Sequence, residues 1–358
     1  MSRLAGWGRR DGGTTVKRQR HLTLNACIAS VLSGALVVAV VGAPAGADKG
    51  GGGAKRSVTV TPVGTYAVGG VQEPFVDDSR PTMATGTYTG APNRTLLTTI
   101  YYPATGTYVE DEVVDNAPPA KSDGPYPLIL FSHGLTATAG VYEGVIGEWV
   151  SAGYVVAAPD YPLSNTNAPG GSVWNSGIAD VKNQPADASF VIDQVLALSK
   201  EPGSLEDMIA RKRIGASGHS LGGITTLALV YADCCIDERV DAAAPMSGVA
   251  GLVDEGADYF VGSDTPLLLL HGDVDGTVPY TGSTEAFARA SEPKFLLTFT
   301  GAGHVTPFVG VEGPQGDVLV AGSVAFWDAY LKGDRTAIDE VRSAASDPGL
   351  ATLQEAAG

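Results

Sequence analysis

Cysteine is scarce in this chain of 358 residues, which contains only Cys27, Cys234 and Cys235. Cys27 falls in the N-terminal segment described below, and the other two cysteines are adjacent. Adjacent cysteines lack the spacing of a zinc site, and a bond between them would close a strained eight-membered ring. We therefore expect two buried or half-buried thiols, without a disulfide framework and without a metal centre.

Basic residues are also few, because 23 Lys and Arg stand against 39 Asp and Glu, for a net charge of −16. Six basic residues and one acid, Asp11, fall in the first 47 residues, so the rest of the chain carries −16 − 5 = −21. This charge repels phosphate backbones and anionic lipids, which excludes nucleic acid and anionic membranes as partners. We expect a well-hydrated surface and a monomer.

The N-terminal segment has a composition of its own. Basic residues precede an apolar run at 22–41, and the following "APAGA" ends in a small-x-small cleavage signal. We interpret residues 1–47 as a secretory signal peptide cut after Ala47, and residues 48–56 as a flexible glycine-rich linker. A transmembrane anchor is the alternative, but polar residues within the run and the cleavage signal favour the signal peptide. We expect an extracellular protein, whose export route the segment leaves open.

Neither an internal repeat nor a second composition regime marks a second domain, so we expect one domain over 57–332 and a tail over 333–358 that is frayed at its end. Short apolar runs alternate with segments of helical periodicity. Strands are expected at 57–63, 95–103, 126–134, 153–162, 213–220, 240–248, 266–273 and 294–304, and helices at 141–153, 187–200, 221–233, 283–292 and 322–333. This order predicts an α/β fold with a mostly parallel sheet, helices on both faces and ligands at the carboxyl ends of the strands.

One serine lies between glycines at such a strand end. Ser220 is the centre of "GHSLG", with an apolar strand before it and an apolar helix after it. Gly218 and Gly222 allow a tight turn in which a Cβ would clash with a neighbouring element. The turn exposes the serine Oγ beside the helix N-terminus, whose free N–H groups stabilise developing negative charge. This context favours a nucleophile over an incidental serine in a glycine-rich turn.

A serine hydroxyl needs a base, and the base needs an orienting acid. The chain has five histidines, at His21, His133, His219, His271 and His304. The first lies in the leader, His133 and His271 end strands, and His219 is expected to direct its side chain away from the serine. His304 follows a late strand on a glycine-flanked loop, so we predict that it is the base.

The acid is expected in "HGDVDGTVP", which ends an intensely apolar strand. We predict Asp275, because it stands further along the loop that must reach His304, whereas Asp273 is expected to structure the turn. The order serine, aspartate, histidine is the one expected on this fold. A calcium loop at "DVDG" lacks the remaining ligands.

Two backbone N–H groups are expected to form an oxyanion hole. One belongs to Leu221, after the nucleophile, and the other to Leu135 in "FSHGL", after an earlier strand. Asp160 also ends a strand, where it lines the pocket or caps a turn.

Four motifs, "FSHGL", "GHSLGG", "HGDVDGTVP" and "GAGH", resemble the α/β-hydrolase superfamily over most of residues 57–332. Within it the chain is similar to secreted bacterial relatives of the dienelactone hydrolases, the platelet-activating-factor acetylhydrolases and the cutinase-like polyesterases. The resemblance implies ester hydrolysis through an acyl-enzyme on Ser220, with Asp275 and His304 and without a cofactor. This chain departs from two of these groups. Polyesterases usually carry an aromatic residue where this chain has Leu135, which argues against a polymer substrate. Dienelactone hydrolases have a cysteine nucleophile where this chain has Ser220.

We therefore predict a secreted serine carboxylesterase, with a small-molecule or polymeric ester as substrate. A cutinase-like polyester hydrolase, a lipase and a catalytically inert binding protein are the alternatives. Residues 249–265 are too short, acidic and glycine-rich for a large apolar lid, and residues 161–181 are polar apart from Trp174, which is expected in a pocket wall. An uncovered site predicts preference for short acyl chains.

Overall fold

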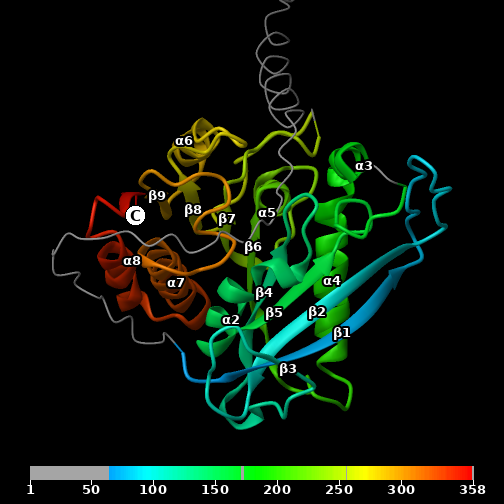
Figure 1. Ribbon diagram of the computed structural model, residues 1–358, viewed down its shortest axis with the longest axis horizontal. Helices are drawn as coiled ribbons and strands as arrows, with labels where there is room; N and C mark the ends of the chain where they lie inside the picture. The colour runs from blue at the N-terminus through cyan, green and yellow to red at the C-terminus, as the bar shows by residue number, and fades with distance from the viewer. Residues whose placement is uncertain (1–63, 171–172, 255, 357–358) are drawn as a thin grey trace, which may run out of the picture. The chain divides into compact units, whose positions relative to one another are not determined.

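The computed structural model describes residues 64–170, 173–254 and 256–356, and within them ten strands form one sheet (Figure 1). The predicted signal peptide, the linker and the strand at 57–63 lie outside the described residues. The strands are β1 (Ala67–Asp77), β2 (Arg94–Ala104), β3 (Val113–Asp115), β4 (Tyr126–Ser132), β5 (Val155–Asp160), β6 (Ile209–His219), β7 (Val240–Met246), β8 (Leu267–Gly272), β9 (Lys294–Phe299) and β10 (Ala351–Ala356). The helices are α2 (Glu143–Ser151), α3 (Val173–Asp180), α4 (Gln184–Leu198), α5 (Leu221–Tyr231), α6 (Thr281–Arg289), α7 (Pro314–Trp327) and α8 (Ile338–Ala344).

The sheet has the order β10-β9-β8-β7-β6-β4-β5-β2-β1-β3. Its central strands, from β9 to β5, run parallel to one another. The pairs β2–β5, β1–β2 and β9–β10 are antiparallel. The carboxyl ends of the central strands therefore meet at one edge, where β6 delivers Ser220.

Alternation along the central strands divides the core between the two faces of the sheet. Ile129 and Phe131 of β4 belong to one apolar cluster together with alternate residues of β7, β8 and β9 and with residues of α2 and α7. Trp149 of α2 and Trp327 of α7 pack edge to face there, with ring centroids 5.8 Å apart. The intervening strand residues are equally buried. The helices α4 and α5 contact each other, and α5 packs against β4, β6 and β7 while α4 packs against β5. The predicted α/β fold, with a mostly parallel sheet and helices on both faces, is thus confirmed, and no described helix is long and apolar enough to span a bilayer.

The C-terminal residues differ from the expectation of a frayed end. They form α8 and then β10, which pairs with β9 from Ala351↔Phe299 to Ala356↔Lys294. The polar "ATLQEA" lacks the apolar pattern of a buried strand, so its periodicity gives no strand signal. The segment still forms a strand, because its backbone hydrogen-bonds to β9 and an edge strand pairs with a neighbour on one side only.

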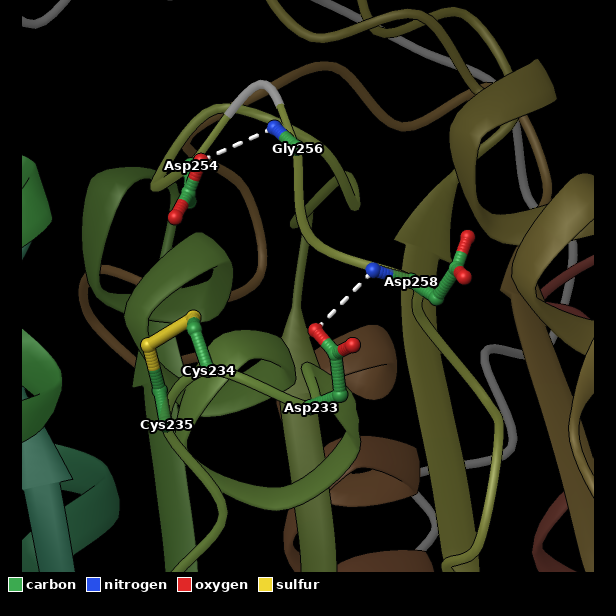
Figure 2. Close-up of a disulfide and its surroundings, with 6 residues drawn as sticks. All are labelled: Asp233, Cys234, Cys235, Asp254, Gly256 and Asp258. Atoms are coloured by element: carbon green, nitrogen blue, oxygen red, sulfur yellow. Dashed lines mark hydrogen bonds between the residues drawn. A yellow bond between two sulfur atoms is a disulfide. The ribbon is translucent and has the colours of Figure 1, made fainter.

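The two cysteines also differ from the prediction, because Cys234 and Cys235 are joined by a disulfide (Figure 2). They lie in the turn after α5, where Cys234 is exposed and Cys235 half-buried. The expectation of two buried or half-buried thiols is therefore wrong, because the sulfurs are bonded and Cys234 is exposed. The turn is tied to the β7–β8 connection. The N–H of Asp233 donates to the Asp258 carbonyl (3.1 Å), and the N–H of Asp258 donates to Asp233 Oδ1 (3.0 Å). Adjacency in sequence did not reveal this bond, because the backbone conformation of the turn decides whether the sulfurs meet.

Candidate active site

The turn between β6 and α5 holds Ser220 in a conformation that side chains rarely adopt, with φ 57° and ψ −115°. A Cβ at Gly222 would collide with the Ser132 carbonyl, and one at Gly218 would lie 2.6 Å from the same oxygen. The N–H of Ser220 donates to the Met246 carbonyl of β7 (2.9 Å). The neighbouring strands therefore require glycine on both sides of the serine and hold its strained backbone in place.

The structure brings the three predicted side chains together. His304 Nδ1 lies 2.7 Å from Asp275 Oδ2, and His304 Nε2 lies 2.8 Å from Ser220 Oγ. A carboxylate accepts hydrogen bonds, so the proton of the neutral imidazole sits on Nδ1. His304 Nε2 is then free to accept the proton of the serine hydroxyl.

Asp275 is buried and receives several donors. Its Oδ1 accepts the N–H groups of Thr277 (2.8 Å) and Val278 (2.9 Å), while its Oδ2 faces both His304 and His271. Burial alone would raise the pKa of this carboxyl, but the hydrogen bonds from His271 and His304 outweigh it and hold the pKa well below its usual range. Asp275 therefore remains an anion that fixes the His304 tautomer.

Asp273, the other acid of the same loop, has a different environment. Its side chain accepts the N–H of Gly301 (2.7 Å), and the residue is exposed. It bridges the loops after β8 and β9, in keeping with the turn-structuring role expected for it.

His271 is a site residue that sequence reasoning missed. Its Nε2 lies 3.1 Å from the Val278 carbonyl and 3.2 Å from Asp275 Oδ2, and its Nδ1 lies 2.7 Å from Ser283 Oγ. Because the carbonyl only accepts, Nε2 carries the proton and Nδ1 accepts from the serine hydroxyl. The ring thus supports the same Asp275 carboxylate oxygen that faces His304. The only sign of this role in the sequence was the position of His271, four residues before Asp275.

The predicted oxyanion loop presents one N–H without a partner. The N–H of Gly134 donates to Tyr142 Oη (3.1 Å) and that of Thr136 to the Ser164 carbonyl (2.7 Å), but the N–H of Leu135 has no partner among the described residues. Leu221 is the first residue of α5, where N–H groups lack an acceptor within the helix. Both predicted donors are therefore able to bind an anion.

The remaining described histidines make contacts within the protein. His133 Nε2 accepts the N–H of Tyr161 (3.0 Å), and burial lowers the pKa of this imidazole. The side chain of His219 was expected to point away from the serine, and its ring nitrogens contact Tyr142 and the His304 backbone rather than Ser220. His133 has a structural role, whereas His219 touches two parts of the site.

Asp160 has one of the two roles considered for it, that of capping a turn. Its Oδ1 accepts the N–H of Ala139 (3.0 Å), and it lines a cavity of about 760 Å³ beside the oxyanion loop. Asp111, Asp115 and Glu143 line the same cavity, which does not include the Ser220, Asp275 and His304 triad.

The connections that border the site contain little helix. Between β7 and β8, the described residues contain no helix. The connection from β5 to α4 contains α3, where a Cβ at Gly177 would collide with the Leu135 side chain. The Trp174 side chain, expected in a pocket wall, lies outside the described part of the structure.

The order of the strands in the sheet and the strained serine between β6 and α5 define an α/β-hydrolase fold. Residues 91–164, about a fifth of the chain, match the family model described as platelet-activating factor acetylhydrolase, isoform II. The match spans the strands from β2 to β5, the helix α2 and the loop of Leu135, and it ends before Ser220. No curated protein matches the chain.

Proposed function

We propose that this protein is a secreted serine carboxylester hydrolase that cleaves short-chain esters through an acyl-enzyme on Ser220. The observation that carries the proposal is the hydrogen-bonded series Ser220 Oγ, His304 Nε2, His304 Nδ1 and Asp275 Oδ2. The N–H of Leu135, which has no partner in the described part of the chain, adds to it. The family match over residues 91–164 agrees with ester hydrolysis. Secretion follows from the leader interpreted above.

The reaction begins when His304 Nε2 takes the hydroxyl proton as Ser220 Oγ attacks the ester carbonyl carbon. The carbonyl oxygen becomes an oxyanion that accepts the N–H groups of Leu135 and Leu221. As the carbon–oxygen bond to the alcohol breaks, His304 returns its proton to the leaving oxygen. Water then attacks the acyl-enzyme with His304 as base, which releases the acid and restores Ser220.

A fluorophosphonate probe tests the nucleophile directly. We expect the folded protein to be labelled, and Ser220→Ala to abolish the labelling. Ser247→Ala is the matched control, since Ser247 Oγ is buried at the end of β7 without a hydrogen-bond partner in the described structure. Failure to label the wild type, or equal labelling of Ser220→Ala, would contradict a serine hydrolase and favour an inert binding protein.

The short-chain preference rests on the absence of a helical lid in the described part of the β7–β8 connection. Substrates should reach an uncovered site from solution, without activation by an interface. In a panel of p-nitrophenyl esters, we expect acetyl to hexanoyl chains to give the highest kcat/KM, with smooth saturation up to the solubility limit. A jump in rate once droplets form would identify a lipase, and release of monomers from a polyester film at comparable efficiency would identify a polyesterase.

A further inference from the structure

The imidazole of His219 is packed among three other rings beside the triad. It stacks on Phe308 with ring centroids 5.3 Å apart, lies 4.8 Å from the His304 ring and 5.7 Å from that of Tyr142. Only 3% of the residue is exposed. A polar ring this deeply buried requires partners for both nitrogens, because an unpaired buried polar atom loses its hydrogen bonds to water without replacement.

Both nitrogens of His219 have such partners, and the chemistry of the partners fixes the direction of each hydrogen bond. The His304 carbonyl lies 2.8 Å from Nε2 and only accepts, so Nε2 carries the proton. Nδ1 is therefore an acceptor, and Tyr142 Oη, 2.9 Å away, donates to it. The same Tyr142 oxygen accepts the N–H of Gly134 (3.1 Å).

These three hydrogen bonds form a series, Gly134–Tyr142–His219–His304, that joins three separate parts of the site. It starts at Gly134, next to the oxyanion donor Leu135, passes through Tyr142 and the residue before the nucleophile, and ends on the backbone of His304. The approach is close, because a Cβ at Gly134 would lie 2.8 Å from Tyr142 Oη. The loop of His304 is also held upstream, where Asp273 Oδ1 accepts the Gly301 N–H (2.7 Å) and the Ala302 carbonyl accepts the N–H of Val274 (3.2 Å), and His219 adds a contact at His304 itself.

We propose that His219 and Tyr142 are positioning residues, which hold the His304 backbone and the Leu135 N–H in register with Ser220. The proposal rests on the proposed function and identifies further residues that act in it. It explains a buried polar series that the triad itself does not use. A base or oxyanion donor displaced by about 1 Å loses about a hundredfold in rate, so such support has a direct effect on catalysis.

The protonation state of His219 suits this role. Burial, with a smaller contribution from the neighbouring His304, lowers the pKa of the His219 imidazole to about 3. The ring therefore stays neutral near neutral pH, and Nδ1 remains available as the acceptor for Tyr142.

Tyr142→Phe provides the first test, with Tyr102→Phe as a matched control. Tyr102 is also buried, and its hydroxyl donates to the Ala117 carbonyl (2.9 Å) away from the triad. Both variants therefore remove a buried tyrosine hydroxyl, but only Tyr142→Phe removes the hydrogen bonds to His219 and from Gly134. With p-nitrophenyl acetate, we expect Tyr142→Phe to lower kcat by about 10- to 100-fold with KM within about twofold. Tyr102→Phe should leave both constants within about twofold of wild type, by the same reasoning. Equal kcat values for both variants, each folded by circular dichroism, would overturn the proposal.

Substitution of His219 separates the two ends of the series. Glutamine places its amide N–H near the position of Nε2 and retains the donor to the His304 carbonyl. Asparagine places its oxygen near the position of Nδ1 and retains only the acceptor for Tyr142. We expect His219→Gln to keep most of the wild-type kcat and His219→Asn to lose about tenfold or more, since only the former still holds the base. The reverse order, or no loss in either folded variant, would contradict the proposal.

These results are distinguishable from failure of the proposed function. If the wild type neither hydrolyses p-nitrophenyl acetate nor reacts with fluorophosphonate, the esterase proposal itself is wrong. If the wild type is active and depends on Ser220, while the Tyr142 and His219 variants are also fully active, only the positioning proposal is wrong.

Discussion

At the scale of single residues, two aspartates of one loop have separate roles. Asp275 is buried under two imidazoles and two backbone N–H groups, whereas Asp273 is exposed and accepts one N–H from Gly301. An acid that fixes the imidazole tautomer acts in every turnover. An acid that bridges two loops acts only through their geometry.

We therefore predict that Asp275→Asn lowers kcat by about 10⁴, because an asparagine that donates to Nδ1 stabilises the wrong tautomer. Asp273→Asn retains an oxygen for the Gly301 N–H and should lower kcat by less than about tenfold. Steady-state kinetics on both proteins, with unfolding curves to confirm the fold, provide the measurement. Similar losses in the two variants would leave Asp275 without its assigned role.

At the scale of elements, a buried ion group fastens α3 and α4 to the start of β2. Arg94 is fully buried and makes paired hydrogen bonds to Asp180 at the end of α3 and to Asp187 in α4. The β5–α4 connection also lies against the predicted oxyanion loop, because a Cβ at Gly177 would collide with the Leu135 side chain. The ion group therefore fixes a segment that borders the site.

Removing Arg94 leaves buried carboxylates without their principal counter-charge, so Arg94→Met should lower the free energy of unfolding by about 3–5 kcal/mol. Lys121→Met is the control, because Lys121 and Glu206 form a pair in which both side chains are exposed (40% and 46%). The control should change stability by less than about 1 kcal/mol. Urea unfolding at pH 7 measures both, and equal effects would show that burial of the Arg94 group does not matter.

At the scale of the whole molecule, acid stability depends on groups whose pKa differs between the folded and unfolded chains. The pKa of His219 is lowered to about 3 in the folded protein by burial and by the nearby His304. Between its ordinary value and about 3, the unfolded chain binds a proton that the folded chain does not, so stability falls as the pH falls. The lowered pKa of Asp275 acts in the same direction, but only below the ordinary aspartate range.

His219→Gln removes the first of these contributions and leaves the second. Between about pH 6 and pH 4, we expect the free energy of unfolding of the wild type to fall by roughly 1 kcal/mol per pH unit more than that of the variant. Urea unfolding across this range gives both slopes. Parallel slopes would mean that His219 is protonated in the folded protein.

The family match over residues 91–164 covers strands and the loop of Leu135, but it does not reach Ser220, Asp275 or His304. The whole-chain assignment to the α/β-hydrolase fold therefore depends on the sheet order and on the strained serine turn, which bring together residues from separate parts of the chain.

The sequence by itself determined the features whose causes are local. Alternation of apolar strands and helices predicted the parallel sheet, and two glycines around Ser220 predicted the tight turn, because both depend on neighbouring residues. The order of Ser220, Asp275 and His304 was also readable, because the carboxyl ends of parallel strands share one edge.

Tertiary structure alone decided the features that depend on distances between separate segments. The support of Asp275 by His271, the series from Tyr142 through His219 to His304, and the pairing of β10 with β9 all join residues that periodicity cannot relate. The disulfide between Cys234 and Cys235 depends on the conformation of a single turn, which adjacency in sequence does not specify. Hydrogen bonds and disulfides require atoms within a few ångströms at defined angles, and only the folded backbone sets those positions.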